Sequence, residues 1–128
     1  EIAITNSSEV QQAAQQLSSE CDAIFIPNDA VIQSAMPVVA AAAKDAGIPV
    51  YGSSAVMVQD GAFATIAISD TEIGAISADM AIEILNGKTP AEIPVIEVPG
   101  TETVINKTTM DAIGITIEDT EGITFVEN

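Results

Sequence analysis

The stretch Asp22-Ala23-Ile24-Phe25-Ile26-Pro27-Asn28-Asp29 places four apolar residues in a row ahead of a proline and two polar residues. A short, uninterrupted apolar run of this kind is typical of a strand that is buried in a parallel sheet. The segment Gly47-Ile48-Pro49-Val50-Tyr51-Gly52 repeats the pattern further along the chain. Further apolar runs occur near residues 2–6 and 63–68. The sequence therefore predicts four parallel strands, near residues 2–6, 23–27, 48–52 and 63–68.

Helical periodicity fills the segments between these strands. Asn6-Ser7-Ser8-Glu9 is typical of a helix start, and apolar residues spaced as on one helix face follow it up to Leu17. A second helix is predicted from Asn28 or Asp29 to about Ala46, with a kink or a broken first turn at Pro37, because an interior proline removes a backbone hydrogen bond. Ser69-Asp70-Thr71-Glu72 is a capping-box sequence that begins a long helix, which Asn86-Gly87 ends.

The rest of the chain carries weaker signals. Residues 53–61 are expected to form a loop or a short helix, and the proline-rich stretch 89–99 an extended connector with room for one edge strand at 95–98. Val104-Ile105 predicts a last short strand, followed by a short helix capped by Asn106 and closed by Gly114. We therefore expect one α/β lobe over residues 1–115, built on an open parallel sheet with helices on both faces, and a loosely held acidic tail over 116–128.

Composition excludes several classes of function. The 128 residues contain 19 acids and three lysines, with no arginine and no histidine, so the net charge is −16. Nucleic acids and anionic membranes attract basic proteins, and we expect neither as a partner. No apolar run reaches the roughly 18 residues of a membrane-spanning helix, so no direct membrane insertion of this segment is expected. The single cysteine, Cys21, has no basic neighbour to stabilise a thiolate and is interpreted as structural.

Catalysis also lacks its usual residues. Without histidine there is no ordinary proton shuttle and no Ser-His or Cys-His pair. Neither of the common glycine-rich nucleotide-binding motifs occurs, and no spaced motif supports an oxygen-ligand metal site from Asp29, Asp60 and Asp70. The sequence therefore predicts a protein that is not an enzyme and that holds no cofactor and no metal.

The candidate binding residues follow the predicted strands. In an open parallel sheet, ligands bind beyond the carboxyl ends of the strands, and polar residues stand at three successive ends, namely Asn28, Asp29, Ser53, Ser54, Ser69 and Asp70. Asp29 or Asp70 could hold a ligand ammonium or sugar hydroxyls. Asn28/Asp29 and Ser69/Asp70 are also good helix caps, so capping alone and capping combined with ligand contact both remain open.

The order and spacing of several segments are similar to one known family. These segments are Asn6-Ser7-Ser8-Glu9-Val10, Asp22 to Asp29, Gly47 to Gly52, Gly61 to Thr65, Glu72-Ile73-Gly74, Ile84 to Lys88, Val104 to Lys107 and Ala112 to Ile115. Over residues 3 to 118 the chain resembles the carboxy-terminal part of ABC-transporter substrate-binding proteins of the tryptophan/tyrosine type. The resemblance implies one lobe of a type I periplasmic-binding-protein fold, in which two lobes close on a small-molecule ligand and deliver it to an ABC permease.

Further expectations follow from that resemblance. In the family the acid after the strand-two proline faces the cleft, and here it is Asp29, while the loop after strand three corresponds to Gly52-Ser53-Ser54. The usual aromatics after strand four are replaced by Ser69-Asp70-Thr71, which puts specificity for aromatic amino acids in doubt. The family's preceding lobe is absent, so we expect a fragment of an extracytoplasmic protein, periplasmic or lipid-anchored. Two alternatives are an effector-binding domain of a lac-repressor-like regulator and a ligand-free dimerisation module.

Overall fold

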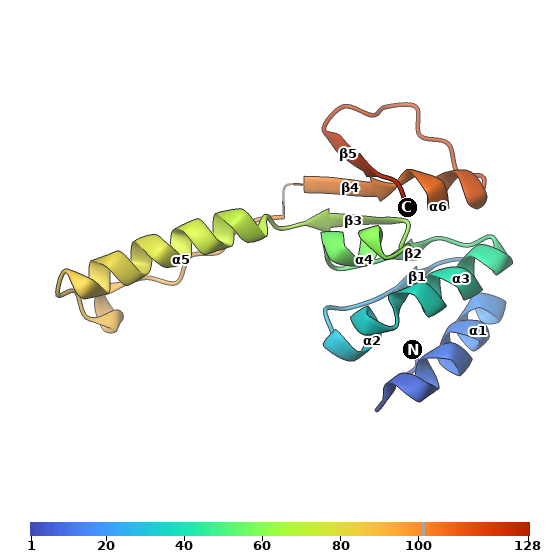
Figure 1. Ribbon diagram of the computed structural model, residues 1–128, viewed down its shortest axis with the longest axis horizontal. Coiled ribbons are helices and arrows are strands. Elements are labelled where there is room, and N and C mark those ends of the chain that lie inside the picture. The colour runs from blue at the N-terminus through green and yellow to red at the C-terminus, as the bar shows by residue number, and fades with distance from the viewer. Residues whose placement is uncertain (101) are drawn as a thin grey trace.

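The structure is a computed structural model that describes residues 1–100 and 102–128. Figure 1 shows a body of helices around a sheet, from which one long helix projects. In chain order the elements are η1 (Ser7–Glu9), α1 (Val10–Glu20), β1 (Ile24–Phe25), α2 (Ala30–Ser34), α3 (Met36–Ala46), β2 (Val50–Tyr51), α4 (Ala55–Gln59), β3 (Ala64–Ala67), α5 (Asp70–Leu85), η2 (Pro90–Glu92), β4 (Glu102–Asn106), α6 (Lys107–Ala112) and β5 (Ile123–Val126).

The sheet has five strands in the order β1-β2-β3-β4-β5. Strands β1, β2 and β3 are parallel, with Ile24 paired to Val50 and Tyr51 paired to Ala64. The three parallel strands predicted near 23–27, 48–52 and 63–68 are therefore confirmed. The sheet is nevertheless mixed, because β4 runs antiparallel to β3 and β5 runs parallel to β4.

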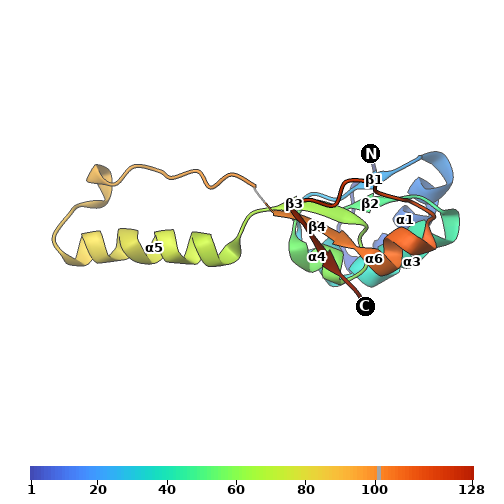
Figure 2. The same ribbon diagram turned by 90° about the horizontal axis from the view of Figure 1, so that it is seen from above.

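The direction of β4 follows from the path of the chain. Helix α5 and the connector after it form an excursion that leaves the body at the end of β3 and returns beside it (Figure 2). Because the chain comes back to the same edge of the sheet, the next strand must run in the opposite sense to β3. We call residues 68–100, which make up this excursion, the arm.

Helices lie on both faces of the sheet, as predicted. The main apolar cluster joins α1, α3 and α4 to one face, through residues such as Ala14, Met36 and Met57 packed near Ile24 and Val104. A second cluster forms on the other face, where α6 and the segment after it cover Phe63, Ala64 and Ile105. Alternate residues of a strand point to opposite faces, which is why the neighbours Val104 and Ile105 belong to different clusters.

The helix predicted from Asp29 to Ala46 is interrupted, as Pro37 indicates. It forms two helices, α2 and α3, with the break at Ala35 and with Pro37 in the first turn of α3. Gly47 then ends α3 in the left-handed conformation, at a φ of 72°, which an L side chain adopts at a cost. This short loop returns the chain directly to β2.

Three expectations are wrong. Residues 2–6 form no strand, although Ile2 and Ile4 are half-buried, and residues 95–98 are extended without a partner strand. A strand is stabilised by its neighbours, and neither segment has one within the described residues. The stretch after Thr116 is not loosely held, because β5 pairs with β4 along four residues. Although this segment is acidic, its residues Ile123 and Val126 pack against the apolar clusters of the body.

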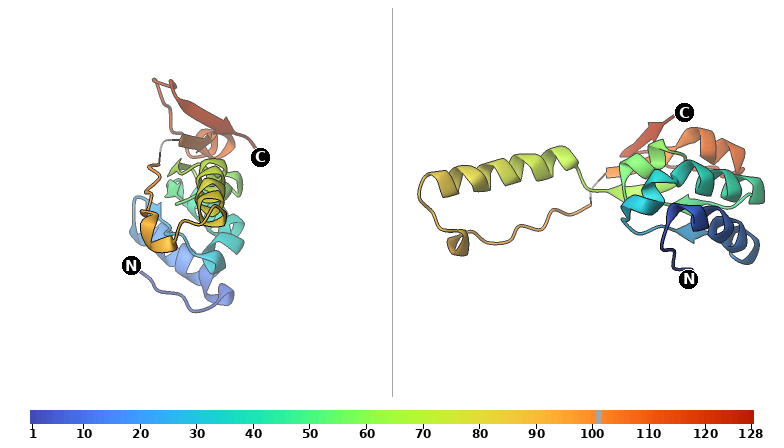
Figure 3. Two further views of the ribbon diagram at one scale, coloured as in Figure 1. Left: turned by 90° about the vertical axis from the view of Figure 1, so that its left-hand side faces the viewer. Right: turned by 60° about the horizontal axis from the view of Figure 1, so that its bottom comes forward.

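The arm has little contact with the body. None of the residues of α5 is buried, and Figure 3 shows the helix and the connector that returns from it standing clear of the sheet. Large apolar side chains are exposed along it, namely Ile68, Ile73, Ile82, Ile84, Leu85, Val95 and Ile96. Such an exposed apolar surface is typical of a contact site for other polypeptide.

Candidate functional site

The three parallel strands place all six predicted site residues at one edge of the sheet. Asn28 and Asp29 follow β1, Ser53 and Ser54 follow β2, and Ser69 and Asp70 follow β3. The strands are adjacent and parallel, so their carboxyl ends, and the loops after them, lie side by side. This edge is where open α/β sheets bind ligands.

Asp29 begins α2 and uses one carboxylate oxygen to do so. Its Oδ1 accepts hydrogen bonds from the backbone N–H groups of Val31, at 2.8 Å, and Ile32, at 3.0 Å. Within the described part of the chain Oδ2 accepts no hydrogen bond, and the side chain is exposed. Asp29 therefore caps the helix while one oxygen remains available to another group.

The loop after β2 is packed more tightly. Ser54 caps α4 by accepting a hydrogen bond from the N–H of Met57, at 3.4 Å, and Ser53 contacts the sulfur of Met57 at 3.7 Å. Gly52 lies so close to this helix that a Cβ atom would stand 2.8 Å from the Cβ of Met57. The backbone at Gly52 is thus held against α4, and both serines are half-buried at the edge.

At the end of β3, Ser69 is half-buried and caps α5. Its hydroxyl accepts a hydrogen bond from the N–H of Glu72 at 3.2 Å, which is the forward half of the predicted capping box. Asp70 is exposed in the first turn of α5, where a carboxylate interacts favourably with the helix dipole. Helix capping is therefore realised for Asp29, Ser54 and Ser69.

Within the described residues, none of the three lysines lies at this edge. Lys44 lies in the last turn of α3, where it lines a small hollow, and Lys107 begins α6; both lie at the opposite edge of the sheet. Lys88 follows α5 on the arm and pairs with Glu83 at 2.8 Å. Since the chain has no arginine or histidine, the charged groups of the edge are carboxylates.

An apolar groove of about 580 Å³ opens beside β1 and reaches Asp29 at one end. Residues 1–4 form one wall, α1 a second and residues 23–27 a third, with Ile2, Ile4, Leu17, Ile24, Ile26 and Ile32 among the lining side chains. Sequence reasoning did not find this groove, because it assigned residues 2–6 to the sheet. Asp29 is the predicted site residue that borders it.

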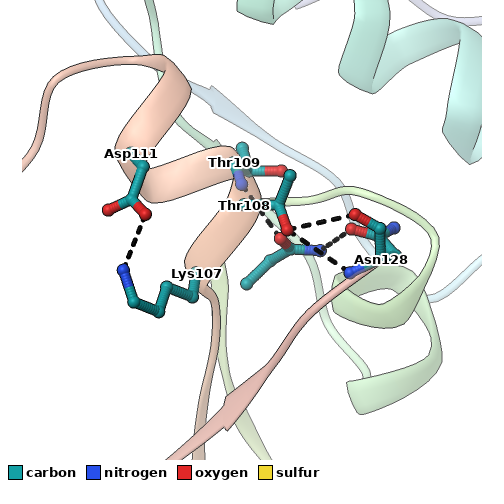
Figure 4. A network of polar contacts seen from close by, with 6 residues as sticks. Lys107, Thr108, Thr109, Asp111 and Asn128 are labelled. Atoms are coloured by element: carbon teal, nitrogen blue, oxygen red, sulfur yellow. Dashed lines mark hydrogen bonds and ion pairs between the residues drawn. The ribbon is translucent and has the colours of Figure 1, made fainter.

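A second group that sequence reasoning missed lies at the far edge. Asn106 is fully buried, caps α6 through the N–H of Thr109 and donates a hydrogen bond to the side chain of Asn128. Figure 4 shows Thr108, Thr109 and Asn128 close together in this network. These residues fasten the segment after β5 to the body, away from the carboxyl edge of β1, β2 and β3. A capping role for Asn106 was predicted, whereas its link to Asn128 has no local sequence signal.

The described residues contain no group of three or more histidine, cysteine or acidic side chains placed to hold a metal ion. Across the same residues, no helix is both long enough and apolar enough to cross a membrane.

Comparisons of the sequence with known proteins agree on one family. The sequence matches the family described as ABC transporter substrate binding protein over residues 1–122. It is 34% identical over 125 residues to the "Tyrosine-binding protein" of Clostridioides difficile (strain R20291), a match that covers 98% of this chain and 36% of the relative. The chain thus spans about a third of the length of that curated relative.

Solved structures agree with the sequence match. The fold is similar to an ABC domain from Streptococcus pneumonia in complex with L-Trp, with a TM-score of 0.86 and 29% identity over 98% of this chain and 43% of the other. It is also similar to a ligand-free, open substrate-binding protein with adhesive properties from Clostridium difficile, with a TM-score of 0.79 and 31% identity over 98% of this chain and 42% of the other. Because the family match spans nearly the whole sequence, this chain belongs to the ABC transporter substrate-binding protein family.

Proposed function

We propose that residues 1–128 supply one lobe of the ligand cleft of an ABC import system, with the cleft at the carboxyl edge of β1, β2 and β3. The observation that carries the proposal is the geometry of Asp29, which caps α2 with Oδ1 alone and keeps Oδ2 free at that edge. Family membership and the names of the relatives, which refer to tyrosine and L-Trp, support a small-molecule ligand.

The charge of the edge favours a ligand that carries a protonated amine. Asp29 and Asp70 supply negative charge, while the three lysines lie elsewhere. An ammonium group would gain a charge-assisted hydrogen bond from the free oxygen of Asp29. A ligand carboxylate would find hydroxyl and backbone N–H donors near Ser53, Ser54 and Ser69, and its remaining partners would come from the second lobe.

The intact protein would then be a two-lobed, extracytoplasmic receptor, either periplasmic or lipid-anchored at the cell surface, that presents its ligand to an ABC permease. Residues 1–115 would form the body of this lobe and its arm, and the acidic segment 116–128 would complete the sheet. Closure of two lobes buries the ligand on both sides, and affinity depends on that burial. A single lobe would therefore bind the same ligand far more weakly.

The proposed protein has no catalytic activity of its own. The chain contains no histidine and no arginine, and its cysteine is exposed without a basic neighbour. A hydrolase or transferase activity that copurifies with the protein and disappears on one point substitution would refute this.

The test is calorimetry on the full-length protein with L-tyrosine and L-tryptophan as probes. Asp29→Asn keeps an oxygen that can cap α2 but removes the charge, so we expect binding to weaken at least about tenfold, which corresponds to roughly 1.4 kcal/mol. Asp45→Asn, an exposed acid at the end of α3, is the matched control and should bind as the unmodified protein does. N-acetyl-L-tyrosine, which lacks the cation, should bind poorly. Unchanged affinity in Asp29→Asn would show that the site is misplaced.

A further inference from the structure

One asparagine of the chain is followed by glycine. Of the five asparagines, Asn86 alone has this neighbour, in the sequence Leu85-Asn86-Gly87-Lys88. The backbone nitrogen that follows an asparagine can attack the side-chain amide of that asparagine, at a rate that depends on how closely the two groups approach. Glycine has no Cβ and the widest range of backbone conformations, so it obstructs this approach least. The chemistry of the sequence thus singles out Asn86 and Gly87.

The pair lies at the end of the arm that is far from the body (Figure 1). Asn86 is the last residue associated with α5, and Gly87 follows it with a φ of 99°. Both residues are exposed, and the side-chain amide of Asn86 makes no hydrogen bond within the described structure. Water therefore reaches the amide carbon, and no side-chain contact in the described residues holds it away from the next backbone nitrogen.

We propose that Asn86-Gly87 is a site of spontaneous covalent modification, at which the asparagine becomes aspartate or isoaspartate. The Gly87 nitrogen attacks Cγ of Asn86, forms an N–Cγ bond and gives up its proton. The side-chain nitrogen of Asn86 leaves with that proton as ammonia, so a cyclic imide remains. Water then opens the imide. Cleavage of the N–Cγ bond gives aspartate, whereas cleavage at the main-chain carbonyl carbon gives isoaspartate, in which the backbone runs through the former side chain.

The last turn of α5 controls when this reaction can occur. Asn86 has a ψ of 6°, and the Gly87 N–H donates to Ile84 O at 3.0 Å. The Lys88 N–H donates to Glu83 O at 3.1 Å. Ring closure requires a different ψ and a free Gly87 nitrogen, so these two hydrogen bonds must open first. Opening costs little free energy, because none of the residues of α5 is buried and the ends of unpacked helices fray.

Three other asparagines lack this combination of features. Asn106 is buried and its side chain is held by hydrogen bonds on both its nitrogen and its oxygen. Asn6 uses its side chain to cap η1. Asn28 is exposed, as Asn86 is, but it precedes Asp29, whose side chain hinders the approach of the backbone nitrogen. Asn28 is therefore the matched comparison within the same molecule.

Isoaspartate at this position would alter the apolar surface of the arm. It lengthens the main chain between residues 86 and 87, which displaces the two N–H groups that close the last turn of α5. That turn carries the exposed side chains of Ile82, Ile84 and Leu85, of which Leu85 is 85% exposed. Exposed apolar surface of this kind is typical of a contact site. The modification would therefore change, irreversibly, the surface with which the arm contacts other polypeptide, and would leave the ligand edge as it was.

Peptide mapping by mass spectrometry tests the site on the full-length protein. In mildly alkaline buffer made with water labelled with heavy oxygen, we expect Asn86 to be converted at least about tenfold faster than Asn28. Both labelled aspartate and labelled isoaspartate should form. Gly87→Ala places a methyl group beside the attacking nitrogen and should slow conversion at Asn86 about tenfold or more, with Asn28 unchanged.

Two results of that experiment would overturn the proposal. The first is conversion of Asn86 and Asn28 at equal rates, because the glycine and the exposed end of α5 would then confer no reactivity. The second is formation of aspartate without isoaspartate, because direct hydrolysis of the amide would then replace the cyclic imide. Neither readout uses a ligand, so both are independent of the proposed binding function.

A further comparison separates the new charge from the altered backbone. The Asn86→Asp variant carries the carboxylate on an ordinary backbone, whereas isoaspartate protein, isolated after incubation, carries it on a lengthened one. We expect the amides of residues 82–88 to exchange at least about threefold faster in the isoaspartate protein than in Asn86→Asp, because the hydrogen bonds that end α5 are lost. The amides of α3 should exchange alike in both. Equal exchange over residues 82–88 would overturn the proposed effect on the arm.

Discussion

The side-chain amide of Asn106 donates a hydrogen bond to Oδ1 of Asn128 at 2.8 Å, which joins the end of β4 to the last residue of the chain. Asn106 also donates to Val58 O at 2.8 Å and accepts the N–H of Thr109 at 2.9 Å. The amide of Asn128 in turn donates to Gln59 O at 2.7 Å. One buried side chain thus connects α4, α6 and Asn128, which follows β5.

Asn128→Ala should destabilise the body by about 1–3 kcal/mol, because it leaves a buried N–H of Asn106 without its acceptor. Urea unfolding monitored by circular dichroism measures the change. Asn86→Ala is the matched control, since Asn86 is exposed after α5 and its side chain makes no hydrogen bond in the described structure; its effect should stay within about 0.5 kcal/mol. Equal stability of the two variants would show that the Asn106–Asn128 link contributes nothing.

Two substitutions of Asp29 separate its role as a helix cap from the role of its negative charge. Asp29→Ala removes the acceptor for the N–H groups of Val31 and Ile32, so we expect a loss of about 1 kcal/mol in the free energy of unfolding. Asp29→Asn retains a capping oxygen and should lose only a few tenths of that. Chemical denaturation of both variants without ligand gives the comparison. If Asp29→Asn were as unstable as Asp29→Ala, the charge would be needed for the fold and the proposed binding test would lose its specificity.

The hydrogen bonds of Glu9, at the start of the amino-terminal helix, predict that the free energy of unfolding depends on pH. The N–H of Thr5 donates to its Oε2 at 2.8 Å, and this backbone hydrogen bond is the main cause of a lowered Glu9 pKa. A carboxyl group with a lowered pKa stabilises the fold above its unfolded pKa, and the stabilisation is lost as the pH falls through the lowered value. Glu9→Gln should therefore be less stable than the unmodified chain at pH 7, and the difference should shrink as the pH is lowered towards pH 3. A difference that stays constant between those pH values would contradict this.

Sequence patterns predicted those parts of the fold that local chemistry determines. Strands β1 to β3 are short apolar runs followed by polar caps, and the break before α3 follows from Pro37. The site residues could be predicted to share an edge because they follow parallel strands. Which oxygen of Asp29 stays free could not be predicted, since it depends on the orientation of the side chain within the cap.

The errors have a common physical cause, which is the dependence of strands on partners. Ile2 and Ile4 are residues of a type common in strands, but the groove separates them from β1, so they pair with no strand in the described part of the chain. Ile123 to Val126 lie in an acidic segment, and they form β5 because β4 offers an open edge. The Asn106–Asn128 link joins residues 22 positions apart, so no local pattern could indicate it.

Helix α5 should be the least protected helix of the 128-residue chain. None of its residues is buried, and a 16-residue helix without tertiary packing is marginal in water. We expect its amides to exchange far faster than those of α3, whose Met36, Val39 and Ala43 lie in the core. Gly74→Ala should slow exchange within α5, because alanine favours a helix over glycine by about 1 kcal/mol and, outside the adjoining backbone of its own helix, no atom stands within 4 Å of the added methyl group. The melting temperature of the body should stay unchanged.

Gly61→Ala is the opposing control for that substitution. Gly61 has a φ of 109°, and an added Cβ would stand 2.9 Å from the Cβ of Ala40 in α3. The same chemical change should therefore lower the melting temperature of the body and leave exchange in α5 as it was, because strain at a positive φ destabilises by roughly 1 kcal/mol or more. Hydrogen exchange and thermal unfolding of the two variants separate the arm from the body. Protection of α5 equal to that of α3 in the unmodified chain would mean that the arm packs against other polypeptide even in the 128-residue chain.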